Sequence, residues 1–103
     1  MTDTFKTIKA KLVTLIMPYE FGEQVAIDLR ALGVSGYTIT KADGWGREGP
    51  RQSGIIDGAN LRLEALVTAE LANEMLHHIV ARFDQDGVVA FMQDVEAIPH
   101  RHR

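Results

Sequence analysis

The order of apolar patterns along the chain constrains its fold more than any other feature. Apolar residues recur at helical spacing in Phe21–Leu32 and again in Glu70–Phe83. Each of these segments lies between two strand-like segments. The strand-like segments are Lys11–Met17, Gly36–Ala42, Asn60–Ala69 and Val88–Val95. This β-α-β-β-α-β order predicts an α+β, ferredoxin-like sandwich, in which an antiparallel sheet carries both helices on one face.

One face of the predicted sheet has no helix to cover it. The strands nevertheless carry Leu, Val, Ile and Phe on both sides. A monomer seldom exposes so much apolar surface. We therefore expect a homo-oligomer that buries this face between copies.

Composition favours one soluble domain over residues 1–103, with a lead-in at 1–10 and a tail at 99–103. A formal charge of −3 does not indicate the basic surface that nucleic-acid-binding proteins usually have. The chain has no cysteine, which excludes disulfides and thiolate metal sites. No apolar run approaches the ~20 residues of a membrane span, and the N-terminus lacks the apolar core of a signal peptide. These features predict a cytoplasmic protein with no direct membrane insertion.

A long loop over residues 42–58 interrupts the strand order. It is rich in glycine and contains Pro50, so it cannot form an ordinary strand interior. Glycines such as Gly44 and Gly46 let backbone N–H groups approach a phosphate, and Arg47 adds charge-assisted hydrogen bonds. On its own this short pattern fits a plain hairpin turn better than a phosphate site. Loops of this length in a compact domain are usually functional or disordered.

The chain resembles the PII signal-transduction proteins over almost its whole length, from Lys11 to Ile98. The resemblance is strongest at Gly36-Tyr37-Thr38 and at Gly44-Trp45-Gly46-Arg47. Three later features resemble the SbtB-like, carboxysome-associated branch of PII-like proteins. They are Arg51-Gln52-Ser53-Gly54, Ala59-Asn60 with Glu64, and the short turn Asp84–Gly87.

The resemblance implies a homotrimer that binds adenine nucleotides in clefts between subunits and has no catalytic residues. It also implies that the loop at 42–58, the family's T-loop, signals to a partner. For Thr38 the competing interpretation is a plain strand former, and for Glu64 a solvated residue. The expected nucleotide-binding residues are Gly36, Tyr37, Thr38, Gly44, Trp45, Gly46, Arg47, Glu64, Leu66, Gly87, Val88, Val89, His100 and Arg101.

The family pattern also indicates which ligand and partner to expect. Val88 stands where classical members have a lysine for the distal phosphates, which favours AMP or ADP over ATP, with cyclic AMP as a further candidate. Bicarbonate is a candidate second ligand near Arg47 and Arg51. The expected partner is a bicarbonate transporter or a carboxysome-associated protein. The loop residues expected to contact it are Glu48, Arg51, Gln52 and Ser53.

Other interpretations stay open at this stage. A classical nitrogen-regulatory PII protein is disfavoured because Glu48 and Asn60 replace the glutamine and lysine of its 2-oxoglutarate site. A ferredoxin-like enzyme or a divalent-cation-binding trimer is disfavoured because no nucleophile–base pair or spaced ligand set appears. His77 and His78 project roughly 100° apart on a helix and are predicted to be surface residues. The tail His100–Arg103 fits a solvated, frayed end at least as well as a ligand-binding one.

Overall fold

The structure is a computed structural model that describes residues 6–43, 45–46, 49–50, 60–84 and 86–99. Its strands and helices alternate in the order that the apolar patterns predict. The elements in chain order are β1 (Ile8–Pro18), a 3-10 turn (Tyr19–Phe21), α1 (Gly22–Leu32), β2 (Thr38–Ala42), β3 (Trp45–Gly46), β4 (Gly49–Pro50), β5 (Asn60–Val67), α2 (Ala69–Phe83) and β6 (Val89–Ala97).

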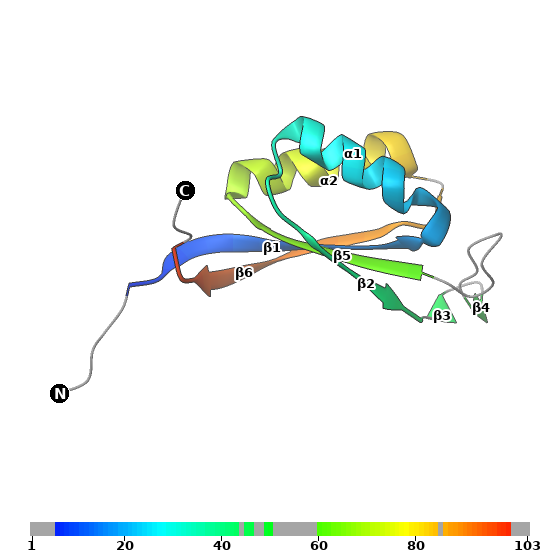
Figure 1. Cartoon of the computed structure of the whole chain (residues 1–103), viewed down its shortest axis with the longest axis horizontal. Helices are drawn as coiled ribbons and strands as arrows, with labels where there is room; N and C mark the ends of the chain where they lie inside the picture. Colours follow the sequence, from blue (N-terminus) through cyan, green and yellow to red (C-terminus); the bar gives the residue numbers. More distant parts are fainter. Residues whose placement is uncertain (1–5, 44, 47–48, 51–59, 85, 100–103) are drawn as a thin grey trace.

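The main sheet has the strand order β2-β5-β1-β6, and all of its pairings are antiparallel. Both helices lie on one face of this sheet, and the start of β1 lies at the end of the sheet away from β3 and β4 (Figure 1). The predicted α+β, ferredoxin-like sandwich is therefore confirmed.

The core lies between the sheet and the two helices. Alternate residues of β1 point toward the helices, so Val13, Leu15 and Met17 are fully buried, as is Leu63 on β5. Residues one helical turn apart complete the core from the other side. They are Val25 and Leu29 on α1, and Ala72, Met75, Ile79 and Phe83 on α2.

Local signals fix the ends of both helices. Gly33 ends α1 with a φ of 107°, the left-handed conformation that glycine adopts without strain. Thr68 caps α2, because its hydroxyl accepts a hydrogen bond from the Leu71 amide at 3.2 Å. In the described part of the chain, neither helix is long and apolar enough to cross a membrane.

The opposite face of the sheet has no helix over it. Ile8, Leu66, Val89 and Phe91 are exposed there, and Leu12 and Ile16 are half-buried. The register joins these positions, because Leu12 pairs with Leu66 and Ile16 pairs with Val89. We call this surface the open face.

Several element boundaries differ from the sequence predictions, by up to three residues. β1 begins at Ile8 rather than Lys11, because Ile8, Lys9 and Ala10 also pair with β6. Beside this pairing, Thr7 donates a hydrogen bond to Glu96 at 2.6 Å, and Lys11 forms an ion pair with Asp94. Such cross-strand contacts stabilise the pairing at a polar strand end that an apolar pattern does not mark. For the same reason β6 extends to Ala97. β2 begins only at Thr38, and the short pairing of β3 with β4 was not predicted.

Candidate functional site

The clearest cluster of predicted site residues lies on the open face, where β2 and β5 meet. Thr38 pairs directly with Glu64, and Leu66 lies two residues farther along β5 on the same face. Thr38 is exposed, Glu64 is half-buried, and Leu66 is exposed. Arg62 donates from Nε and Nη2 to Glu64 Oε2, at 3.3 Å and 3.2 Å. The structure therefore brings three of the predicted nucleotide residues together beside a cation.

Thr38, Glu64 and Thr14 form a row of cross-strand neighbours on the open face. The sequence analysis missed Thr14. It pairs with Glu64 on one side and with Phe91 on the other. Its side chain is fully buried, and within the described residues its hydroxyl has no hydrogen-bond partner. The available signal was a single polar residue inside the apolar run Lys11–Met17.

A second group of predicted residues lies at the opposite edge of the sheet. Gly87, with a φ of 73°, and Val88 lead into Val89, the first residue of β6. Because β2 and β6 are the two edge strands, β5 and β1 separate Thr38 from Val89, by about 14 Å at the usual strand spacing. The two groups therefore do not form one compact site within a single chain.

The remaining predicted residues lie in the loop and the tail. Trp45 and Gly46 form β3, which follows β2. Gly44, Arg47, Glu48, Arg51, Gln52, Ser53, His100 and Arg101 lie outside the described residues. β6 ends at Ala97, at the end of the sheet farthest from Gly87 (Figure 1).

Tyr37 and Gly36 separate from Thr38 in the structure. Tyr37 packs against the core on the helix side, and its hydroxyl accepts a hydrogen bond from Arg30 of α1. Gly36 is exposed, and a Cβ built on it would meet no atom within 4 Å. On the open face, a ligand can therefore reach only the backbone of Gly36 and Tyr37 and the side chain of Thr38.

A polar cluster joins the two helices on the covered side of the sheet. His78 Nε2 lies 2.7 Å from Asp28 Oδ2, Gln24 donates to Asp28 Oδ1 at 2.7 Å, and Arg82 lies 3.6 Å from Asp28. Burial alone raises the pKa of Asp28, but these hydrogen bonds and the charge of Arg82 outweigh it, so the pKa of Asp28 lies below its ordinary value. His77 is exposed, as predicted, whereas His78 is half-buried and contacts Asp28.

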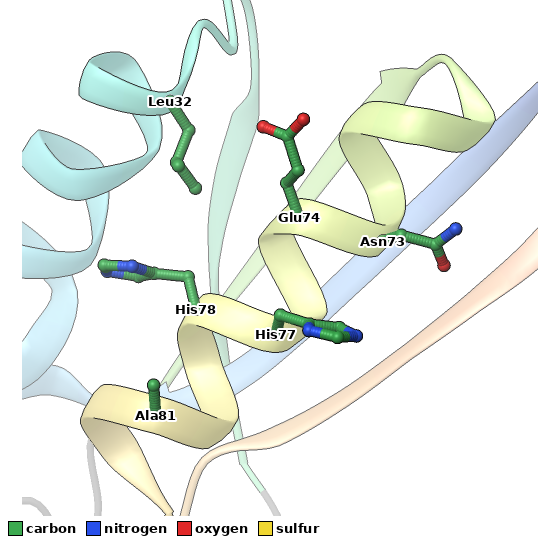
Figure 2. A pocket seen from close by; sticks show the side chains of 6 residues that line it. All are labelled: Leu32, Asn73, Glu74, His77, His78 and Ala81. Carbon is green, nitrogen blue, oxygen red and sulfur yellow. The ribbon is translucent and has the colours of Figure 1, made fainter.

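A hollow of about 460 Å³ lies over the outer side of the helices. Glu74 and His78 project from α2 toward α1, while Asn73 and His77 project to the other side (Figure 2). None of the predicted nucleotide residues lines it. Among the described residues, no three His, Cys, Asp or Glu side chains lie close enough to hold a metal ion. The hollow is therefore distinct from the site predicted on the open face.

Comparisons with known proteins identify the family. Residues 10–102 match the family model described as Nitrogen regulatory protein P-II, while no curated protein matches the sequence. A PII-like signaling protein from Thermus thermophilus is 29% identical, with a TM-score of 0.76 over 91% of this chain and 94% of that one.

Structures of CPII, a nitrogen regulatory PII-like protein from Thiomonas intermedia, are also similar. The form bound to ADP, AMP and bicarbonate is 25% identical, with a TM-score of 0.79 over 93% of this chain and 100% of that one. The form bound to ADP and bicarbonate is 26% identical, with a TM-score of 0.80 over 91% of this chain and 93% of that one. With a family match over nearly the whole chain and the same fold, this protein belongs to the P-II family.

Proposed function

We propose that this PII-like regulator binds AMP or ADP in clefts between the subunits of a homotrimer and is not an enzyme. The observation that carries the proposal is the similarity to CPII, which covers 93% of this chain and whose structure holds ADP, AMP and bicarbonate. The ligand would set the conformation of the T-loop, and the loop would report it to a partner protein.

The separation of the predicted residues supports a site between subunits. In one chain, Thr38 and Glu64 lie near one edge of the sheet, and Gly87–Val89 lie at the other. A neighbouring copy packed on the open face would bury apolar residues such as Phe91 and Leu66. It would also bring its own Gly87–Val89 turn toward the Thr38–Glu64 pair, so that two chains complete one site.

Inorganic carbon is the signal we assign to this regulator. The bicarbonate held by CPII supports this assignment, together with the resemblance to the carboxysome-associated branch. The anion would bind near Arg47 and Arg51, beside the nucleotide phosphate. The T-loop would then contact a bicarbonate transporter or a carboxysome-associated protein from the cytoplasm, through Glu48, Arg51, Gln52 and Ser53.

Nitrogen regulation is the alternative that the family description raises. The 2-oxoglutarate lysine of classical members corresponds to Asn60, which is only 1% exposed. An amide buried at the start of β5 gives a keto acid neither a positive charge nor access. Tight binding of Mg-ATP together with 2-oxoglutarate would favour this alternative over ours.

The two threonines of β2 provide a matched test by titration calorimetry. Thr38 and Thr40 are both exposed on the open face, but only Thr38 pairs with Glu64. Thr38→Val removes one hydroxyl and should weaken AMP and ADP binding about five- to tenfold, the usual effect of one hydrogen bond. Thr40→Val should leave the affinity unchanged, and both variants should remain trimeric. Equal affinities in the two variants would contradict the site.

Bicarbonate and ATP form two further arms of the same titration. Bicarbonate should raise the affinity for AMP, and no difference with and without it would count against the inorganic-carbon assignment. ATP should bind more weakly than ADP, because Val88 supplies no charge for a γ-phosphate. Arg47→Ala should weaken all three nucleotides and leave the trimer intact.

A further inference from the structure

The connection from α1 to β2 joins the end of a helix to the first residues of the proposed nucleotide site. Tyr37 and Thr38 are consecutive, yet their side chains lie on opposite sides of the sheet. Thr38 pairs with Glu64 on the open face, whereas Tyr37 packs against the core on the helix side. The tyrosine side chain is therefore a contact to α1, and only its backbone belongs to the proposed site.

The beginning of this connection is fixed by the end of α1. The Gly33 amide donates to the Arg30 carbonyl at 3.1 Å, and the Val34 amide donates to the Leu29 carbonyl at 3.0 Å. This is a Schellman motif, and its usual apolar contact is present because Val34 and Leu29 belong to the same core cluster. The chain is thus held as far as Val34, and two exposed residues, Ser35 and Gly36, lead to Tyr37.

The fold does not require a glycine at position 36. Its φ is not positive, and a Cβ there would meet nothing within 4 Å, so a side chain would fit in this chain. What the glycine provides is a bare backbone that another molecule can approach closely. It also adds conformational freedom, which must be lost when a ligand binds to this backbone.

We propose that Arg30 is a positioning residue for the adenine-nucleotide site, acting through Tyr37. The backbone carbonyl of Arg30 holds the start of the connection, and its guanidinium holds the end through the Tyr37 hydroxyl. Ser35 and Gly36 are therefore fixed at both ends by one residue. Folding, rather than nucleotide binding, then orders the Gly36–Thr38 backbone, and this pre-organisation raises affinity. The inference rests on the proposed function.

Tyr37→Phe tests the proposal with the smallest change. It keeps the ring in the core and removes only the acceptor of the Arg30 hydrogen bond. AMP affinity should fall about three- to tenfold, through a less favourable binding entropy. Hydrogen exchange at the Gly36 and Tyr37 amides should be faster in the free variant than in the free wild type, and equal once AMP is bound. The thermal midpoint should change little.

Substitutions of arginine separate this role from a general effect of charge. Arg30→Met removes the donor and should weaken AMP as much as Tyr37→Phe, and the double variant should be no weaker than either single variant, because all three lose the same contact. Arg30→Lys keeps a donor and should recover part of the affinity. The matched control is Arg82→Met, which removes the same charge from α2 without touching Tyr37 and should leave the affinity unchanged.

The outcomes distinguish the two proposals. If the wild type binds neither AMP nor ADP, the proposed function fails and the inference fails with it. If the wild type binds and Tyr37→Phe binds equally well with unchanged exchange at Gly36, only the positioning role is overturned. A loss of affinity in Arg82→Met equal to that in Arg30→Met would also overturn it.

Discussion

The two faces of the sheet are made of similar residues but lie in different surroundings. Leu63 and Leu66 are three residues apart on β5, yet Leu63 is 0% exposed under the helices and Leu66 is 57% exposed on the open face. The chain covers the first face with its own α1 and α2, whereas no described element of the chain covers the second face. Stability of the single chain therefore depends on the first face, and in the proposed trimer assembly and ligand binding depend on the second.

The largest expected difference between the faces comes from this pair of leucines. Leu63→Ala should destabilise the fold by about 2–5 kcal/mol, because it leaves a cavity between the sheet and the helices. Leu66→Ala removes the same atoms from the open face and should mainly weaken the association of copies. Urea unfolding measures the first effect, and sedimentation equilibrium measures the second.

Protein concentration must be varied in both experiments, because the stability of an oligomer includes its assembly. At concentrations where the wild type is dissociated, Leu66→Ala should lie within about 1 kcal/mol of the wild type. Equal losses for the two variants under those conditions would contradict the distinction between the faces.

The covered face was largely predictable from the sequence, and the open face was predictable only in part. Helical spacing in Glu70–Phe83 and alternation in Asn60–Ala69 are properties of the chain itself, so they identified the elements and most of the core. The exposure of Phe91 and Leu66 also agrees with the expectation of apolar residues on both sides of the strands. What would cover them in an assembly is not encoded in any local pattern.

The arrangement of the candidate site was also predictable only in part from the sequence. Gly36, Tyr37 and Thr38 are consecutive and were grouped as one binding segment, but strand alternation directs the Tyr37 side chain to Arg30 and that of Thr38 to the open face. The spacing of a strand predicts such a separation, whereas the hydrogen bond to Arg30 depends on where α1 ends. The contact of His78 with Asp28 was missed for the same reason, because it joins residues 50 positions apart.

The polar cluster on the covered face gives the next largest effect. Asp28→Asn should destabilise the fold by about 1–3 kcal/mol at neutral pH, because the hydrogen bonds of a buried carboxylate are weakened. The pKa of Asp28 is lower in the folded protein than its ordinary value of 3.8. Its stabilising contribution is therefore complete above the unfolded pKa and is lost as the pH falls through the folded pKa. Unfolding below pH ~4 should be less steep in Asp28→Asn than in the wild type.

Asp94 provides the matched control for this acid effect. Its hydrogen bond and charge contact with Lys11 lower the pKa of Asp94 as well, but its side chain is 85% exposed on an edge strand. Solvent screens such a pair, so Asp94→Asn should change the acid unfolding curve less than Asp28→Asn. The reverse order would mean that the cluster between the helices contributes little.

The smallest expected effect concerns Thr14, which lies on the open face although it is fully buried by its neighbours. Its hydroxyl has no partner within the described chain, and a buried hydroxyl without a hydrogen bond destabilises a protein. Thr14→Val keeps the shape and removes the hydroxyl, so the stability of the dissociated chain should stay equal or rise by up to about 1 kcal/mol. Thermal unfolding at low and high protein concentration measures this. A loss of more than about 1 kcal/mol only at high concentration would mean that a neighbouring copy bonds to Thr14, which would extend the row Thr38–Glu64–Thr14 into the interface.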